Sequence, residues 1–441
     1  MLAHILLVGK VLGVVLKQSG IRLRLWFSSF LHRLTYKPGP EPKNIVIVGA
    51  SFAGYHAARC LVNAVPSGYR VVVIEKNSHF QLTWVLPRFC VVDGHDYKAF
   101  IPYGPYLKAP SGSYRWIQDT VESIRPNSTP RGQGTVQVAS GESIDYEYLV
   151  WTTGSSAALP SRLSHADKDE ASRGLQDQRQ QLQKARDIVV VGGGPAGVEL
   201  AADAKAQYPE KNVTLIHSRK ALLYDGYGIK LHRAIHKAME ELGVHLVLGE
   251  RPVIPDGVTG DITLSDGSIH FDHMVSFLLL SFSPRALYTY SEGQIKCTGQ
   301  KPRSELLRFL SPTTFSASGH IRVKPSLQVA DDAFDRIYAA GDVIWTEHLK
   351  NARSAMQQAQ IVADNICRAI RGGQQIEYQQ QWWEGTTKVT LGLGGSAVFM
   401  TDGEAEWLVS MKQKTDLDSW MVWKALGAKP FKDNVTSFEK D

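Results

Sequence analysis

Two glycine-rich segments in this 441-residue chain have the residue types and spacing that bind phosphate. Each follows a short apolar run, NIVIV in the first case and DIVVV in the second. Their motif positions are, in order, Gly49, Ser51 and Gly54, then Gly192, Gly194 and Gly197. A turn from a buried strand into a helix directs backbone N–H groups and the positive end of the helix dipole at a pyrophosphate. Two such turns predict two bound dinucleotides. The simplest explanation for two dinucleotides in one protein is hydride transfer between them.

Carboxylates elsewhere in the chain indicate which dinucleotide each turn binds. Glu75 ends the strand-like segment YRVVVIE, where a carboxylate accepts hydrogen bonds from both ribose hydroxyls of an adenosine. Glu75 could instead simply end a strand at the surface. Asp342 follows the tight Ala-Ala-Gly turn of RIYAAGDV and precedes a helix, a position suited to the ribityl chain of a flavin. Together these residues predict FAD at the first turn.

The second turn lacks the matching carboxylate. His217 occupies the position equivalent to Glu75, and Arg219 follows two residues later. Because arginine binds phosphate in a bidentate manner, this pattern favours NADPH over NADH. Glu199, in the first turn of the helix after Gly197, either helps to place the nicotinamide or complements the helix dipole.

The order of elements predicts an α/β protein with two Rossmann-like domains. The unit strand, turn, helix, strand occurs from residue 43 and again from residue 187, which is an internal duplication. We expect an FAD-binding domain at 43–165 and 300–372, interrupted by an NAD(P)-binding domain at 166–299. Residues 373–441 form a smaller C-terminal α+β region facing an interface or a membrane, and residues 1–42 form a targeting or membrane-associating segment with its linker.

The charge distribution argues against a nucleic-acid partner. The formal net charge is +6, but six basic residues lie in the first forty positions, which contain no Asp or Glu. They are Lys10, Lys17, Arg22, Arg24, Arg33 and Lys37. The remaining 43 basic residues balance the 43 acidic ones, so the folded domains carry no basic footprint.

The N-terminal segment is apolar and basic. Its run LAHILLVGKVLGVVL is interrupted by His4 and Lys10, which makes it too broken for a membrane span of about 20 residues. The continuation IRLRLWFSSFLHRLTYK is typical of a transit peptide or of a helix lying in a membrane interface. We therefore expect a mitochondrial or membrane-associated protein, with the cytoplasm as the alternative.

No residues are assigned to protein-based catalysis or to a metal site, because bound cofactors would carry the chemistry. The four cysteines, Cys60, Cys90, Cys297 and Cys367, have no redox or metal spacing, which argues against a disulfide reductase. His232 and His236 lie one helical turn apart without a third ligand, so we interpret them as a solvated helix face.

The combined motifs resemble the AMID-like branch of the apoptosis-inducing-factor flavoproteins, which is related to type II NADH dehydrogenases. The matching segments are VIVGASFAG, IEKNSHF, YLVWTTGSS, VVVGGGPAGVELAAD, VTLIHSR and IYAAGD, spread over about residues 43–370. The resemblance implies that FAD contacts the whole first turn, Arg88, the backbone of Val121, and Asp342. The turn residues are Gly49, Ala50, Ser51, Phe52, Ala53 and Gly54. Ser51 and Ser281 stand where relatives have glycine.

The family implies oxidation of NADPH or NADH by FAD, with electrons passed to a quinone, another small-molecule acceptor or oxygen. Two other functions stay open at this point. The chain could be a soluble tailoring flavoenzyme of specialised metabolism, such as a monooxygenase or dehydrogenase. It could also be a redox-responsive interaction protein linked to apoptosis, whose nucleotide state controls partner binding. The sequence does not determine the oligomeric state.

Overall fold

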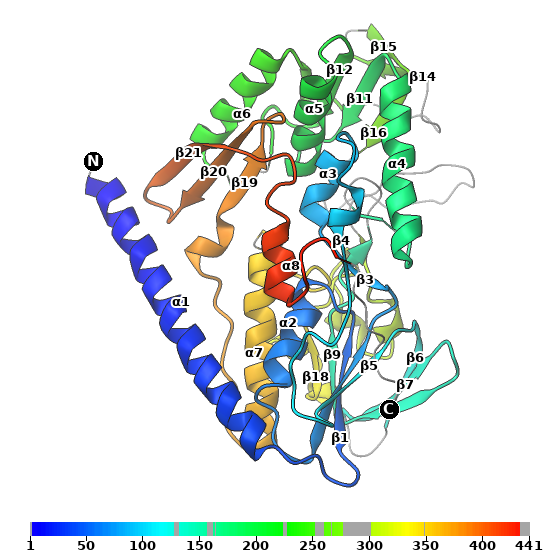
Figure 1. Ribbon diagram of the computed structural model, residues 1–441, viewed down its shortest axis with the longest axis vertical. Coiled ribbons are helices and arrows are strands. Elements are labelled where there is room, and N and C mark those ends of the chain that lie inside the picture. The colour runs from blue at the N-terminus through cyan, green and yellow to red at the C-terminus, as the bar shows by residue number, and fades with distance from the viewer. Residues whose placement is uncertain are drawn as a thin grey trace.

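The protein is built from three sheet-containing regions and a long N-terminal helix that lies along one side of them (Figure 1). The computed structural model describes residues 2–127, 132–156, 162–163, 165–223, 227–251, 260–265, 267–276, 301–347 and 349–432. Ser281 and Cys297, singled out in the sequence, lie outside these ranges.

The first region is a parallel five-stranded sheet in the order β18-β9-β1-β2-β5. The strands are β1 (Lys43–Val48), β2 (Tyr69–Ile74), β5 (Tyr114–Ile117), β9 (Tyr148–Trp151) and β18 (Ile337–Ala339). The central strands are apolar and buried, as expected for a sheet with both faces covered. Helices α2 (Phe52–Leu61) and α7 (Ala352–Ile370) pack against each other on this region. An antiparallel sheet of β6 (Val121–Pro126), β7 (Gly134–Val138) and β8 (Ser143–Tyr146) is attached to it.

The second region is also built on a parallel sheet. Its parallel sheet has the order β13-β12-β11-β16, formed by β11 (Asp187–Val191), β12 (Asn212–His217), β13 (His245–Leu248) and β16 (His273–Ser276). Helices α5 (Pro195–Gln207) and α6 (Ile229–Leu242) pack on it, and α4 (Lys168–Lys184) precedes it. A hairpin of β14 (Gly260–Leu264) and β15 (Gly267–Phe271) completes the described part. The prediction of two Rossmann-like domains is confirmed; the proposed boundaries stay a prediction.

The C-terminal region is an antiparallel sheet followed by a short helix. Strands β19 (Thr387–Thr390), β20 (Gly395–Thr401) and β21 (Glu406–Lys412) lie against α5 and α6 of the second region. Helix α8 (Trp420–Leu426) returns to the first region, where Leu426 O accepts from the Tyr55 hydroxyl at 2.9 Å. Trp423 of α8 is fully buried, with its indole N–H bonded to Lys98 O at 3.0 Å. This tryptophan is therefore part of the core rather than of a membrane-facing surface.

The remaining elements are short. They comprise α3 (Leu86–Phe89), β3 (His79–Gln81), β4 (Phe100–Pro102), β10 (Ser155–Ser156), β17 (Lys301–Pro302) and six 3-10 turns. Of these turns, η6 (Trp382–Gly385) precedes the C-terminal sheet.

The N-terminal segment is one continuous helix, α1 (Leu2–Thr35). Near its start, Lys10 forms an ion pair with Asp402 after β20, with Nζ 2.5 Å from Oδ2. Near its end, a ring nitrogen of His32 lies 2.7 Å from Val65 O, and the Tyr36 hydroxyl donates to Tyr69 O at 2.8 Å. Among the described residues, no helix has both the length and the apolar character needed to cross a bilayer.

Buried ion pairs join the regions. Arg88 of α3 is 1% exposed, and its Nε lies 2.5 Å from Oδ2 of Asp203 on α5, which is completely buried. Its remaining guanidinium nitrogens donate to Gly392 O at 2.9 Å and Leu393 O at 3.2 Å, in the β19–β20 connection. One side chain thus connects three segments that are far apart in sequence.

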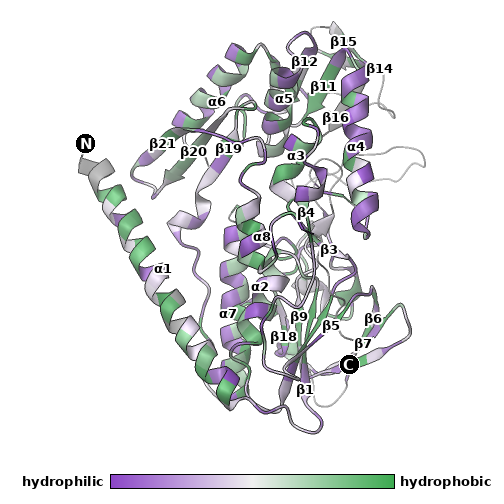
Figure 2. Cartoon of the chain, viewed as in Figure 1, coloured by the Kyte–Doolittle hydropathy of each residue, from purple (hydrophilic) through white to green (hydrophobic). Residues whose placement is uncertain are grey.

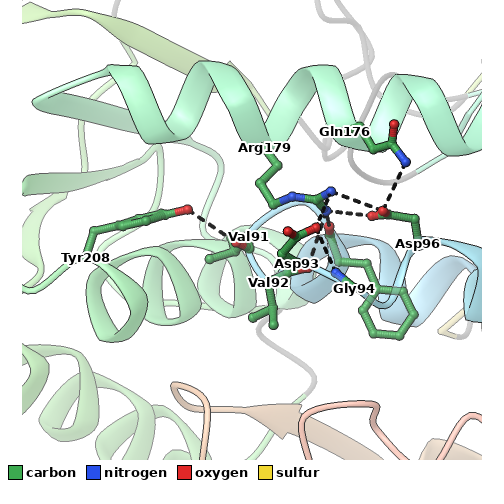
Figure 3. Close-up of polar contacts among 9 residues, drawn as sticks. Val91, Val92, Asp93, Gly94, Asp96, Gln176, Arg179 and Tyr208 are labelled. Atoms are coloured by element: carbon green, nitrogen blue, oxygen red, sulfur yellow. Dashed lines mark hydrogen bonds and ion pairs between the residues drawn. The ribbon is translucent and has the colours of Figure 1, made fainter.

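A second ion pair connects α4 to the segment after α3 (Figure 3). Arg179 Nη1 lies 2.6 Å from Asp96 Oδ1 and also donates to Phe89 O at 3.1 Å. Asp93 contacts Arg179 at 2.8 Å, and the Tyr208 hydroxyl donates to Val91 O at 3.3 Å. The residue 86–96 segment of the first region is therefore held from both α4 and α5.

We predict that Arg88→Met destabilises the protein by about 3–5 kcal/mol, because it leaves the Asp203 carboxylate buried without its counter-charge. Urea unfolding followed by circular dichroism measures the change. The double variant Arg88→Met, Asp203→Leu should recover much of the loss, since it removes both charges. A loss below about 1 kcal/mol in the single variant would contradict the interpretation.

Candidate functional site

The first turn has the geometry of a phosphate-binding loop. Gly49 has φ +89°, and a Cβ there would lie 2.7 Å from Thr152 O. A Cβ on Gly54 would overlap the carbonyl oxygen of Gly49, so both positions require glycine. Ser51 has φ −77° in extended backbone, which any residue adopts, and it occupies the N-cap of α2. Serine at the middle position therefore introduces no backbone strain.

Glu75 faces this turn. It is 6% exposed, and its Oε2 accepts from the Ala50 N–H at 2.6 Å. The other carboxylate oxygen accepts from the N–H of Asn77 at 2.9 Å and from its side-chain amide at 2.7 Å. The Tyr103 hydroxyl donates to Ala50 O at 2.6 Å. A glycine cradle with a buried carboxylate beside it fits the adenosine diphosphate half of FAD.

Sequence reasoning did not single out three basic side chains near the first turn: Lys76 and Arg303, which interact electrostatically with Glu75, and Arg162, which interacts with both of them. Arg162 donates to Ser155 O and lies beside Gly154, whose carbonyl accepts from the Arg303 N–H at 3.0 Å. Burial lowers the pKa of Arg303, and the neighbouring Arg162 charge lowers it further. Burial likewise lowers the pKa of Lys76, with a further contribution from Arg303. Three cations and one carboxylate leave excess positive charge, which suits the phosphates of a dinucleotide.

Asp342 lies close to the same turn. The preceding Gly341 has φ +82°, and a Cβ there would lie 3.2 Å from the Ala53 Cβ on α2. The Gly341 N–H donates to Gln358 Oε1 on α7 at 2.8 Å. Asp342 lines a hollow in which α7 supplies Ser354, Ala355 and Gln358, and Tyr378 and Gln380 supply another wall. The structure therefore brings Asp342 next to the start of α2, as a ligand spanning both would require.

Lys350 is a further residue that sequence reasoning missed. It lines the hollow beside Asp342, and its Nζ donates to Asp342 O at 3.0 Å. Burial lowers the pKa of Lys350 to about 8, although the nearby Asp342 charge acts in the opposite direction. An amine with this pKa gains and loses a proton near physiological pH. In the sequence, a lysine shortly after a Gly-Asp pair is only a weak indication that the lysine belongs to a binding site.

The second turn repeats the first with one change. Gly192 has φ +115°, and a Cβ on Gly193 would lie 2.7 Å from the His217 ring. The Gly193 N–H donates to His217 Nδ1 at 3.1 Å, just as the Ala50 N–H donates to Glu75. His217 thus replaces the carboxylate in both sequence and space. Gly194 is the N-cap of α5, and Gly197 is buried in its first turn.

The half-buried Arg219 lies in the bend after β12, where its carbonyl accepts from the Gly249 N–H at 2.9 Å. Binding of a 2′-phosphate by its guanidinium stays a prediction. Val121 begins β6 and is half-buried, and its predicted contact with adenine likewise stays a prediction.

Arg88 and Glu199 were assigned to different cofactors, but the structure places them in one cluster. Glu199 Oε1 accepts from the Thr390 N–H at 3.0 Å. Burial raises the pKa of Glu199 to about 8; the charge of Asp203 raises it further, and that of Arg88 lowers it. Burial also raises the pKa of Asp203 to about 6. Because protein groups enclose the Arg88 guanidinium, its predicted FAD contact has no support in this geometry and stays a prediction.

The structure describes three of the four cysteines and both histidines of the helix that begins at Ile229. Cys90 is buried, and burial raises the pKa of its thiol. Cys60, Cys90 and Cys367 are free thiols. His232 Nδ1 lies 2.5 Å from Leu222 O, while His236 pairs with Glu240 at 3.3 Å. Within the described ranges, no group of His, Cys, Asp and Glu side chains could hold a metal ion.

We predict that Arg303→Gln speeds FAD release about tenfold, the size expected for losing one charge-assisted contact. Dilution of the holoprotein and recovery of flavin fluorescence give the rate. Arg308→Gln is the matched control, because Arg308 is exposed in the same segment. Equal release rates in wild type and Arg303→Gln would exclude a role for this cation in FAD binding.

We predict that Lys350→Met removes an alkaline limb from the pH profile of NADPH oxidation. Since the folded-state pKa is about 8, the positive charge beside Asp342 is present below that pH and lost above it. Wild-type turnover should fall as pH rises through 8, whereas the variant should be slower and nearly flat from pH 7 to 9. An unchanged limb in Lys350→Met would show that another group causes it.

A protein-family comparison matches residues 43–359 to the pyridine nucleotide-disulphide oxidoreductase model. Fe-regulated protein 8 of Mycosarcoma maydis is 31% identical over 410 residues, covering 88% of this chain and 96% of the relative. Ferroptosis suppressor protein 1 of Xenopus tropicalis is 28% identical, with the same two coverages. Apoptosis-inducing factor homolog A of Dictyostelium discoideum is 28% identical, covering 74% of this chain and 77% of that protein.

A comparison of folds identifies similar solved structures. The sulfide:quinone oxidoreductase of Aquifex aeolicus superimposes with a TM-score of 0.65 at 16% identity, covering 89% of this chain and 93% of that one.

The expected AMID-like resemblance and the expected cofactors, FAD and NAD(P)H, are confirmed. The chain belongs to the pyridine nucleotide-disulphide oxidoreductase family and is an FAD-dependent oxidoreductase that uses NAD(P)H.

Proposed function

We propose that the protein oxidises NADPH and reduces a quinone at a membrane, with oxygen as the alternative acceptor. The observation that carries this proposal is the pair of dinucleotide turns with unlike partners, Glu75 at one and His217 at the other. The fold similarity to a sulfide:quinone oxidoreductase favours a quinone as the acceptor.

The reaction balances without a protein nucleophile. NADPH gives up a hydride, one further proton comes from solvent, and the quinone leaves as a quinol. Bound FAD supplies a ring that accepts two electrons from one partner and passes them to another. The residues of the chain bind and orient the two dinucleotides. The two turns would hold the phosphates, and Glu75 and Asp342 would hold the polyol groups. Lys350 holds a proton beside Asp342.

The preference for NADPH rests on charge. His217 has no carboxylate that could accept a hydrogen bond from the ribose 2′-hydroxyl of NADH. The site therefore lacks the contact that would favour NADH. Arg219, two residues later, supplies positive charge near the same strand end. The 2′-phosphate of NADPH would therefore lie near a cation, whereas an NADH-specific site has a carboxylate at this position.

We further propose a mitochondrial or other membrane-bound location. The support is α1, whose apolar sequence contains five lysine and arginine residues and no acidic one. A quinone dissolved in the bilayer would then be available to an enzyme attached to its surface. A cytoplasmic location is the alternative.

An anaerobic titration tests the function. The purified holoprotein should lose its flavin absorbance near about 450 nm on adding NADPH and regain it on adding a short-chain quinone. Fast reoxidation by oxygen with indifference to quinones would instead indicate a tailoring flavoenzyme. A protein with bound FAD that NADPH and NADH both fail to reduce would favour a redox-responsive interaction protein.

We predict that Arg219→Ala raises the KM for NADPH at least tenfold, the loss expected for a charge-assisted phosphate contact, and leaves the KM for NADH unchanged. Steady-state kinetics with both nucleotides give the comparison. Lys220→Ala is the control, because Lys220 is the exposed neighbour. An equal rise in the KM for both nucleotides in Arg219→Ala would show that Arg219 does not recognise the 2′-phosphate.

A further inference from the structure

Much of the α1 ribbon is coloured as hydrophobic in Figure 2, and many of its large apolar side chains are exposed to solvent. From residue 12 onward, eight of the large hydrophobic side chains described on α1 are at least half exposed, at spacings of one, three, four or seven residues. They are Leu12, Val15, Leu16, Leu23, Trp26, Phe27, Phe30 and Leu34, which we call the α1 stripe. Spacing of this kind places them on one side of a helix. An exposed apolar surface of this extent marks an interaction site.

The opposite side of α1 faces the body of the protein. Leu7 is buried, and Val14, Gln18 and Ile21 line a hollow of about 350 Å³ with Trp382 and Trp383 of η6. The helix is fixed at both ends, by the Lys10–Asp402 ion pair and by the contacts of His32 and Tyr36. Since these contacts use the other side of α1, the orientation that exposes the stripe is set by the fold.

The charges along α1 determine how it can meet a bilayer. At 1.5 Å per residue its 34 residues extend about 50 Å, longer than the bilayer core. However, Lys10, Lys17 and Arg33 interrupt it, and charged side chains are costly at the bilayer centre. A helix with an apolar side and cationic residues along its length lies in the interface, with the apolar side inserted.

We propose that the α1 stripe inserts into the outer layer of an anionic membrane, with α1 lying parallel to the surface. Lys17 and Arg33 of α1 and Lys37 after it are exposed, and the first forty positions contain no acidic residue, which complements negatively charged lipid headgroups. Pairing of two stripes in a dimer would instead bring like charges from two α1 helices together. The inference rests on the proposed membrane function and specifies the surface and the lipid class.

Vesicle co-sedimentation tests the inference with the FAD-loaded full-length protein. Binding to phosphatidylcholine vesicles containing 30% phosphatidylserine should be strong, and binding to phosphatidylcholine alone should be at least tenfold weaker. The double variant Trp26→Glu, Phe30→Glu should lose at least tenfold in binding, because it places two charges in the stripe. Ile229→Glu is the matched control, since Ile229 is 57% exposed on α6 and lies outside the stripe; it should bind as wild type does.

Two readouts separate this inference from the proposed function. The double variant should retain its flavin spectrum and its NADPH oxidation with a water-soluble quinone, which shows that it is folded. Unchanged vesicle binding in the double variant would overturn the inference. So would a dimer, detected by sedimentation velocity, that the same substitutions dissociate. Normal vesicle binding by a protein that fails to reduce any quinone would overturn the proposed function but not this inference.

Discussion

The buried contact between Arg88 and Asp203 is the interaction on which the arrangement of the three regions depends. It joins α3 of the first region to α5 of the second, and the same guanidinium holds the β19–β20 connection. A buried charge that loses its partner is costly, so neither side of the contact can move away alone. The two nucleotide-binding turns belong to separate sheets, and this contact fixes one sheet relative to the other.

The two turns are copies of one unit that differ in the side chain facing the backbone. In each copy the N–H after the first glycine donates to the side chain that ends the next strand. The acceptor is a carboxylate in one copy and an imidazole nitrogen in the other, so the backbone geometry is kept while the charge changes. The basic residues near the first turn add positive charge on the FAD side.

Burial has opposite effects on two titratable groups near these sites. It raises the pKa of Glu199 to about 8 and lowers that of Lys350 to about 8, because a low-dielectric environment disfavours the charged form of either group. An acid and a base are thereby brought into the pH range in which both exchange protons.

The sequence by itself determined the two turns and the strands before them and singled out Glu75 and Asp342 near the first turn, because glycine spacing and apolar runs are local properties. Tertiary structure decided what no local pattern contains. It paired Arg88 with Asp203 across more than a hundred positions and placed Lys350 beside Asp342. It also brought Arg303 and Arg162 near Lys76 and Glu75 and turned the apolar side of α1 outward. Arg88 and Asp203 are 115 positions apart in sequence, and only packing of the whole chain brings such residues together.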